Sequence, residues 1–428
     1  MKRISVVLVC FVLLASLLSG CDTSDVGTGS ESEKTKLKIE AWGIETDPNS
    51  RIIKEAVNLF NERNSNAVIE IEFTEQEQYK TKIATLMAAN EAPDLFNTWA
   101  AGFLKPFVTS GKVYSISDDL NKDSWKNSYI NGIFAPFTFD GKIYAAPTTQ
   151  TVACLFYNKE IFDQYGLKAP ETYSELKNVI ETLNKNGIIP FALGNKAPWV
   201  GAMFSELVAN RIGGSEPFNK VYEGTGTWLD PSFIEAGRIM YELVEMNAFP
   251  EGFNALDNDP AQELFKEGKA AMLVMGSWAI QQLTNEESPL KGKVDVARFP
   301  AMEGGKGNIN SWLGQPDQSF AISTNCKNKE AAVEFLKTIA SKEIQTKFAE
   351  AGNLVATKIT IDPAKSNPVA IKVAELQKDM EELFLFYDVA LGSTIGNEYN
   401  NAIQAITAGK DPEEALRALQ EFTEQNRE

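Results

Sequence analysis

The chain has 428 residues, more than one hydrophobic core usually supports, and its 43% hydrophobic and 23% charged content is ordinary for a globular protein. Its 58 acidic and 41 basic residues give a net charge of −17, without a basic cluster, so the surface disfavours nucleic acid and anionic lipid heads. The absence of histidine excludes Ser-His-Asp and Cys-His catalysis and imidazole zinc sites. A glycosidase that uses two carboxyl groups is not excluded, because it needs only Asp or Glu.

The N-terminus follows the pattern of a bacterial lipoprotein leader. Lys2 and Arg3 precede an apolar run over residues 4–18 that is too short to span a bilayer comfortably, and two small residues then lead to Cys21. This order predicts a signal peptide over residues 1–20 and a mature chain that begins with acylated Cys21. The alternative, an unanchored chain with an apolar N-terminus, leaves the order of charge, run length and cysteine unexplained.

Residues 21–36 are predicted to form a lipidated flexible linker, because residues 22–36 show no apolar periodicity. Beyond the linker, strands and helices alternate. Strands are expected over residues 37–42, 68–73 and 94–97, and helices over residues 50–61 and 79–89. This order predicts right-handed crossovers and a mainly parallel sheet covered by helices.

A second series of elements begins after residue 170. Thr172 and Glu175 have the spacing of a capping box, and the amphipathic helix that follows is expected to end at Gly187, before a strand over residues 188–193. Three later helices are expected to begin with an aspartate N-cap followed by proline. These Asp-Pro pairs start at Asp230, Asp259 and Asp411.

Cysteine and motif content predict neither a cofactor nor a metal site. Cys10 lies in the leader and Cys21 is assigned to the lipid, which leaves Cys154 and Cys326 in the body. Cys154 lies in an apolar run and is expected to be a buried thiol, with a Cys154–Cys326 disulfide as the less favoured alternative. The sequence contains no P-loop, GxGxxG, GxSxG or CxxC motif.

Tryptophan marks the candidate binding site. Ligands bind beyond the carboxyl ends of strands in open α/β sheets, and four of the seven tryptophans follow predicted strands. These four are Trp42, Trp99, Trp199 and Trp278, and their polar neighbours are Glu45, Asn97, Asn195 and Ser277. A pyranose has an apolar face and a rim of hydroxyls, so flat rings beside hydrogen-bonding groups suit a sugar.

Core packing is the competing interpretation for each tryptophan taken alone, whereas four at strand ends favour a cleft. Trp125 and Trp228 are expected to pack internally. Trp312 lies in an expected loop between glycines and is a weaker candidate for ligand contact.

Five segments, in this order and spacing, resemble the extracellular solute-binding proteins of ABC importers, in the family 1 branch that binds sugars and includes the maltodextrin-binding proteins. The segments are APDLFNTW, DGKIYAAPTTQTVACLFYNKEIF, LFKEGKAAMLVMGSW, NKEAAVEFLKTIASKEIQTKF and AITAGKDPEEAL. The resemblance covers residues 37–420, and the leader is typical of Gram-positive members.

The resemblance implies a two-lobed periplasmic-binding-protein-like α/β fold of type II. Each lobe would be a mainly parallel sheet flanked by helices, and a hinge of several chain segments would join the lobes. The first lobe would comprise residues 37–147 and 316–360. The second lobe would comprise residues 148–315 and 361–428.

The resemblance also implies which residues contact the ligand. Trp99 would stack on a sugar from the first lobe, and Trp199 and Trp278 from the second. Their hydrogen-bonding and stacking partners would be Trp42, Glu45, Gln78, Asn97 and Asn195. Near Gly396 and Asn397, where maltodextrin binders carry another stacking aromatic, this chain has none, which puts maltodextrin itself in doubt.

The function implied is capture of a sugar, most simply an oligosaccharide, between two lobes that close on it, followed by delivery to an ABC permease and its ATPase subunit. The protein would be a monomer on the extracellular face of the cell membrane, and it would not be an enzyme. It would bind no nucleic acid.

Three alternatives remain open: a binding protein for another solute such as a polyamine, a carboxylate-pair glycosidase, and an adhesive surface protein. A neutral sugar would bind with little dependence on salt, and with nearly constant affinity from about pH 6 to 8 if the carboxylates are unperturbed.

Overall fold

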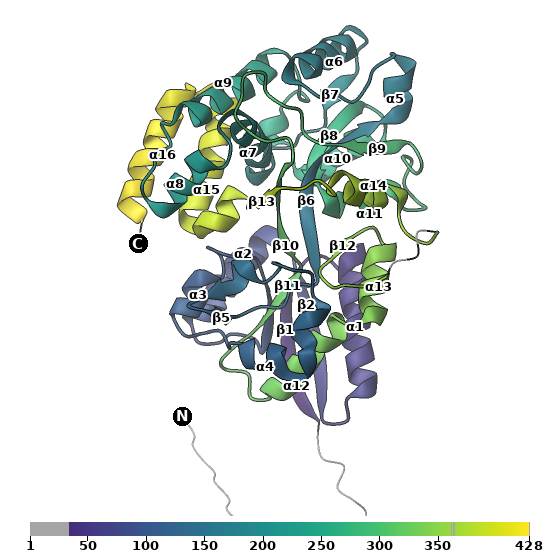
Figure 1. Ribbon diagram of the computed structural model, residues 1–428, viewed down its shortest axis with the longest axis vertical. Helices are drawn as coiled ribbons and strands as arrows, with labels where there is room; N and C mark the ends of the chain where they lie inside the picture. The colour runs from purple at the N-terminus through teal and green to yellow at the C-terminus, as the bar shows by residue number, and fades with distance from the viewer. Residues whose placement is uncertain (1–33, 361, 363, 428) are drawn as a thin grey trace, which may run out of the picture. The chain divides into compact units, whose positions relative to one another are not determined.

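The computed structural model describes residues 34–360, 362 and 364–427 (Figure 1). The expected signal peptide, Cys21 and most of the expected linker lie outside the described residues. Within the described part, no helix is both long and apolar enough to cross a membrane.

A four-stranded sheet has the order β11-β3-β1-β2. Its strands are β1 (Thr35–Trp42), β2 (Ala67–Thr74), β3 (Leu95–Thr98) and β11 (Ser319–Ile322). β1 pairs in parallel with both β2 and β3, as the alternation of strands and helices predicts, and β11 joins β3 in antiparallel orientation. β1 begins two residues before the expected strand, because Thr35 and Lys36 pair with Ala67 and Val68.

Helices cover this sheet with the apolar faces that their periodicity predicts. α1 (Pro48–Arg63) buries Ile53, Ala56, Val57 and Phe60. α2 (Gln76–Ala88) starts earlier than expected, because the Glu75 side chain caps its first backbone N–H groups. α12 (Lys329–Ile339) and α13 (Lys342–Glu350) return from late in the chain and pack against α1 (Figure 1).

Between β3 and the next long strand the chain forms short elements. They are α3 (Lys105–Thr109), α4 (Ser117–Asn121), the 3₁₀ helices η1 (Lys122–Ser128) and η2 (Ala135–Phe137), and the hairpin of β4 (Thr138–Phe139) and β5 (Lys142–Ile143). Phe103, just before α3, packs its ring edge-on against Trp99.

The second, larger sheet has seven strands, with β6 at its centre. The strands are β6 (Thr149–Asn158), β7 (Ile189–Phe191), β8 (Ala270–Gly276), β9 (Val294–Ala297), β10 (Ser311–Asp317), β12 (Leu354–Val355) and β13 (Glu382–Phe384). β6 is antiparallel to β8, β9, β10 and β12, whereas the β7–β8 and β10–β13 pairs are parallel. This sheet is therefore mixed, unlike the mainly parallel sheet expected for each lobe.

The direction of two strands explains the mixed character. β6 carries the chain out of the four-stranded sheet, and β10 returns the chain to it, since β11 starts at Ser319, directly after Gln318. Two neighbouring strands that carry the chain in opposite directions must pair antiparallel. At this crossing the Thr148 hydroxyl donates to the Gln318 carbonyl at 2.6 Å, and the Ala356 N–H donates to the Thr148 carbonyl at 3.1 Å.

Helices surround the larger sheet (Figure 1). They are α5 (Lys159–Gln164), α6 (Tyr173–Lys185), α7 (Trp199–Gly213), α8 (Glu216–Glu223), α9 (Pro231–Glu245), η3 (Phe253–Ala255), α10 (Asn258–Lys266), η4 (Ser277–Ala279), α11 (Ile280–Thr284), α14 (Pro368–Leu376), α15 (Tyr387–Thr407) and α16 (Pro412–Asn426). α7 packs against both α9 and α15, so it is buried almost throughout its length.

The helix starts confirm most of the capping predictions and correct one. Thr172 caps α6, and Asp230 and Asp411 cap α9 and α16, each before a proline. The prediction for Asp259 was wrong, because α10 begins at Asn258 with Asp257 in the N-cap position. Asp259 lies inside the first turn, and its carboxylate is therefore not used as the cap.

The structure tests the predictions for the two cysteines of the body and for three tryptophans. Cys154 in β6 and Cys326 are both buried free thiols, so the alternative of a disulfide between them is excluded. Trp228 is fully buried, as expected, and Trp125 is partly buried. Trp312 lies in β10 and not in a loop, and only 3% of its surface is exposed.

Candidate functional site

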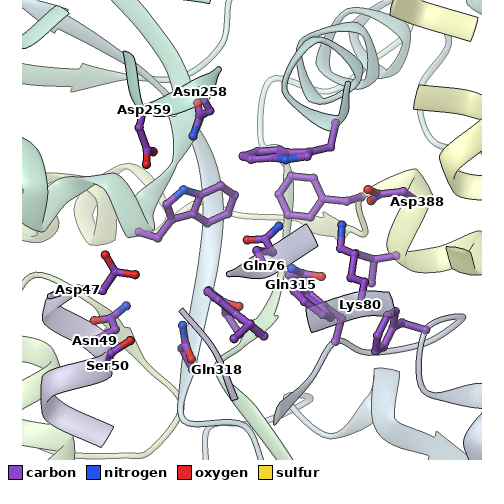
Figure 2. Close-up of a pocket in the computed structure, with 18 of the residues that line it drawn as sticks. Asp47, Asn49, Ser50, Gln76, Lys80, Asn258, Asp259, Gln315, Gln318 and Asp388 are labelled. Atoms are coloured by element: carbon purple, nitrogen blue, oxygen red, sulfur yellow. The ribbon is translucent and has the colours of Figure 1, made fainter. Parts of the chain in front are cut away.

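A cavity of about 230 Å³ is lined by side chains from both halves of the fold. From the elements around the four-stranded sheet come Trp42, Asp47, Asn49, Gln76, Lys80 and Trp99. From those around the larger sheet come Trp199, Glu206, Asp259, Trp278, Phe386 and Asp388. In Figure 2, Asn258 and Asp259 approach from one side and Asp47, Asn49 and Ser50 from the opposite side, with aromatic rings between them.

One wall of the cavity is a pair of parallel indole rings. Trp42 is the last residue of β1, and Trp99 directly follows β3, the parallel neighbour of β1. The two rings stack with centroids 5.4 Å apart and planes 8° apart. Trp99 is only 7% exposed, because the rings of Tyr79 and Phe103 also contact it. Adjacent strand ends thus build a flat aromatic surface.

The opposite wall holds a second indole pair in a different arrangement. Trp199 begins α7, and Trp278 lies in η4, directly after β8. Their rings meet edge to face, with centroids 6.1 Å apart and planes 62° apart. Gly276 makes this geometry possible, because a Cβ atom at that position would overlap the Trp278 ring. Both rings are only partly buried, so part of their surface remains accessible.

Buried polar atoms without hydrogen-bond partners gather around these rings. Trp42 Nε1, Glu206 Oε2, Gln315 Oε1 and Gln318 Oε1 are buried, have no hydrogen-bond partner among the described residues, and belong to residues that line the cavity. Leaving such an atom unpaired costs about 1 to 3 kcal/mol. A ligand that brings both donors and acceptors would satisfy them, and hydroxyl groups have this property.

The cavity is rich in carboxyl groups. Asp47, Glu206, Asp259, Asp317 and Asp388 line it, whereas Lys80 is the one basic residue among the lining side chains. The Lys80 ammonium pairs with Glu77 at 3.0 Å and lies 5.5 Å from the centroid of the Trp99 ring. This charge distribution disfavours anionic ligands.

Burial changes the acidity of three of these carboxyl groups. It raises the pKa of Asp317 to about 6 and the pKa of Glu206 well above its ordinary range. Burial also raises the pKa of Asp47, with a smaller contribution from the charge of Asp259 across the cavity. The expected constant affinity between pH 6 and 8 assumed unperturbed carboxylates, and Asp317 does not meet that condition.

The two halves of the fold are in contact beside the cavity. The Gly102 N–H, next to the cavity residue Phe103, donates to the carbonyl of Val389 in α15 at 2.9 Å. A Cβ atom on Gly102 would overlap the backbone of Ala390 and Gly392. Gly392 itself interrupts α15, with a φ of 80° that favours glycine. The backbones of the two halves of the fold are therefore in contact in this structure.

Of the residues predicted to bind ligand, the structure brings Trp42, Trp99, Trp199 and Trp278 together around the cavity. It places Glu45 and Gln78 on the surface, outside the cavity lining. Glu45 pairs with Lys54 at 3.1 Å, and Gln78 lies in the first turn of α2, where its backbone N–H donates to the Glu75 carboxylate.

The other three predicted site residues are buried away from the cavity lining. The Asn97 side chain donates to the Ser319 carbonyl at 2.8 Å and so links β3 to β11. Asn195 accepts from the Gly201 N–H at 3.0 Å and donates to Asn254 at 2.8 Å, which fixes the start of α7. Trp312 is enclosed in β10, where it pairs with Leu383 of β13.

Sequence reasoning missed the polar lining, because none of the polar residues predicted to bind ligand lines the cavity. Gln76 comes shortly after the end of β2, so the same strand-end argument that selected the tryptophans would have found it. Gln315 and Asp317 lie in a strand that crosses between the sheets, and Glu206 lies within a helix. No local sequence signal separates these three from ordinary core positions.

Comparison with known proteins agrees with this architecture. The model of the bacterial extracellular solute-binding protein family matches residues 44–346. The multiple sugar-binding protein of Streptococcus mutans is 24% identical over 356 residues, which is 81% of this chain and 80% of that protein. The galactooligosaccharide-binding protein of Bacillus subtilis is 25% identical over 435 residues, 97% of this chain and 95% of that protein.

Solved structures share the fold over almost the whole described chain. A structure from work on xylan utilization by the thermophilic bacterium Caldanaerobius polysaccharolyticus is 34% identical, with a TM-score of 0.86, and the match covers 90% of this chain and 99% of that one. A chitin oligosaccharide binding protein reaches the same TM-score of 0.86 at 24% identity and shares the fold.

The α/β fold is thus that of the periplasmic solute-binding proteins, with two mixed sheets flanked by helices. Proteins of this kind are transport receptors and not enzymes. Among the described residues, no group of three or more Cys, Asp or Glu side chains could hold a metal ion. The family model, the fold and a cavity between two walls lead to one conclusion: the chain belongs to the bacterial extracellular solute-binding protein family.

Proposed function

We propose that this protein binds a neutral oligosaccharide in the cavity between its two tryptophan pairs. The observation that carries the proposal is the set of four unpartnered buried polar atoms on residues that lie around the indole rings. Sugar hydroxyls would pair with these atoms, while the indoles contact the apolar faces of the sugar rings. Trp42, Trp99, Trp199 and Trp278 would make these contacts.

The names of the relatives support a sugar. The Streptococcus and Bacillus relatives are named for multiple sugars and for galactooligosaccharides, and the 34% identical structure comes from work on xylan utilization. The acidic lining would also favour neutral sugars over anionic ones, because its negative charge would repel phosphorylated or carboxylated sugars.

We place the two lobes at residues 37–147 with 316–360 and at residues 148–315 with 361–428. The start of β6 at Thr149, after the bridge between Ala146 and Phe320, and the passage from β10 to β11 between Asp317 and Ser319 support bounds close to these positions, although β12 pairs with β6 of the larger sheet. Sugar would bind one lobe first and close the other onto it, which would favour the backbone contact between Gly102 and Val389.

The closed form would deliver the sugar to a membrane permease coupled to an ATPase subunit. A lipid on Cys21 would hold the protein at the extracellular face of the cell membrane, since the leader has the order of a lipoprotein signal. Cys21→Ala should move the processed protein from the membrane fraction to the medium. Retention of the cleaved variant in the membrane fraction would contradict the lipid anchor.

A thermal-shift screen of the mature protein tests the sugar proposal. The panel should contain xylotriose, chitotriose, maltotriose, raffinose and the polyamine spermidine. A sugar present at 100 times its dissociation constant should add about 2.7 kcal/mol to the free energy of unfolding. A panel in which only spermidine stabilises the protein would overturn the proposal.

Spermidine is included because the five carboxyl groups and four indoles of the cavity also suit a cation. Salt distinguishes the two cases. A neutral sugar should lose less than about twofold in affinity between 50 and 500 mM salt, because no net charge is neutralised. A polyamine should bind much more weakly at the higher salt concentration.

A further inference from the structure

Glu206 is a buried carboxyl group that lines the cavity, and the proposed pairing of its Oε2 atom with a sugar hydroxyl does not say which of the two groups donates the hydrogen bond. It lies in α7, seven residues after Trp199, so the two side chains project from the same face of the helix. Only 1% of its surface is exposed, and it lines the cavity. A carboxylate at such a position normally has a cationic partner or several donors.

The surroundings of Glu206 do not stabilise a negative charge. Its Oε1 accepts one hydrogen bond, from the Tyr387 N–H at 3.1 Å, and its Oε2 has no hydrogen-bond partner within the part of the chain that the structure describes. No ion pair of the described residues includes Glu206. The charged group whose field acts on Glu206 is Asp388, another acid, which lines the same cavity and raises the pKa of Glu206 further.

The other titratable groups on the elements around Glu206 are neutral, acidic or already bonded to other groups, so they do not stabilise a negative charge on it. α15 presents Tyr387 and Tyr399, both buried and neutral, together with Asp388. On α9, Arg238 pairs with Glu235, and Glu242 pairs with Lys177. Arg211, one turn further along α7, donates to the carbonyls of Asn308 and Ser311. Across the cavity, Lys80 pairs with Glu77.

We propose that Glu206 keeps its proton and donates a hydrogen bond from the neutral carboxyl group to an oxygen of the bound sugar. This inference rests on the proposed sugar function and names the residue that orients the sugar unit next to α15. A protonated carboxyl group offers one O–H donor and retains an acceptor oxygen, whereas a carboxylate only accepts. Gln315 and Gln318 offer unpartnered acceptor oxygens, so Glu206 would supply the complementary donor.

The geometry also defines which sugar unit fits next to Glu206. A hydroxyl or ring oxygen accepts from a neutral carboxyl group without a change of charge. A uronic acid carboxylate at this position would instead meet the acid Asp388, which lines the same cavity. The subsite would therefore favour a neutral unit over a uronic acid unit.

The first experiment needs no ligand. Infrared spectra of the mature protein at pH 7 should contain a protonated carboxyl band that is absent from Glu206→Gln and present in the control Glu235→Gln, since Glu235 lies outside the cavity lining. The absence of a difference between the wild type and Glu206→Gln would overturn the inference, because Glu206 would then be ionised.

The second experiment measures affinity by calorimetry for whichever of xylotriose, chitotriose, maltotriose and raffinose binds the wild type most tightly. Glu206→Gln, a neutral donor of similar shape, should bind within about threefold of wild type, and Glu206→Leu should lose at least tenfold. The melting temperatures of both variants identify any unfolded protein, and Glu206→Gln remains decisive if Glu206→Leu does not fold.

The outcomes separate the two proposals. If the wild type binds a sugar and Glu206→Gln loses tenfold or more, the Glu206 inference is overturned while the sugar function stands. If the wild type binds none of the four sugars, the sugar function is overturned together with the inference, whatever the infrared band shows.

Discussion

The two walls of the cavity are built in different ways. Trp42 and Trp99 stand at the ends of neighbouring parallel strands and stack within 8° of parallel, and Trp99 also packs against the rings of Tyr79 and Phe103. Trp199 and Trp278 start a helix and follow a strand, meet edge to face, and lie beside the buried carboxyl group of Glu206. In the first wall Trp99 belongs to the core and Trp42 is only partly buried, whereas both indoles of the second wall are partly buried.

This difference predicts that mutations in the two walls affect different quantities. Truncation in the first wall should lower the stability of the free protein together with its affinity. Truncation in the second wall should lower mainly the affinity.

The largest effect is expected for Trp99→Ala. Trp99 is 7% exposed and contacts three other aromatic rings, so its removal leaves a cavity in the core. The free energy of unfolding of the ligand-free protein should fall by about 3 to 5 kcal/mol. Urea unfolding checks this value. A loss below about 1 kcal/mol would show that Trp99 is a surface ring like those of the opposite wall.

A smaller effect is expected for Trp199→Ala, and it should appear in affinity. The Trp199 ring is partly exposed, so its loss should weaken sugar binding by about 1 to 3 kcal/mol, on the scale of an aromatic hot spot. Calorimetry with the best sugar of the panel measures this loss, and the melting temperature of the ligand-free variant should stay close to that of the wild type. Trp125→Ala, outside the cavity lining, is the matched control, and its affinity should not change.

The smallest effect is expected for Asp317, which lies in β10, the strand that crosses between the two sheets. Burial raises its folded-state pKa to about 6 from an ordinary value of 3.8. The unfolded chain therefore releases this proton at lower pH than the folded protein, and stability decreases as the pH rises through the folded pKa. Asp317→Asn removes this cost. The free energy of unfolding of the variant relative to that of the wild type should therefore rise by between about 1 and 2 kcal/mol when the pH is raised from 4.5 to 8.

Urea unfolding of wild type and Asp317→Asn at the two pH values measures this change. Asp118→Asn serves as the control, because Asp118 lies on α4, outside the cavity lining. A stability difference between wild type and Asp317→Asn that is the same at both pH values would show that Asp317 titrates like an exposed carboxyl group.

Local sequence patterns determined much of the fold and four of the six aromatic side chains that line the cavity. The apolar spacing of α1, the alternation of β1, β2 and β3 with helices, and the caps of α6, α9 and α16 depend on residues close in the chain. Trp42, Trp99 and Trp278 follow from one local rule, because the carboxyl end of a strand is a local feature that places a side chain at the sheet edge. Trp199 starts α7, well beyond the end of β7 at Phe191.

Tertiary structure alone decided the polar lining and its chemistry. Glu206 and Asp317 become unusual acids only because distant segments bury them, and residue type and spacing carry no record of burial. Asn97 and Asn195 look like ligand partners in sequence, yet they bond to Ser319 and Asn254 once the chain is folded. The antiparallel direction of β10 beside β6 also depends on tertiary structure, because β10 must return the chain to the four-stranded sheet. Burial, partner choice and strand direction are set by contacts between segments far apart in the chain, and a single sequence does not display those contacts.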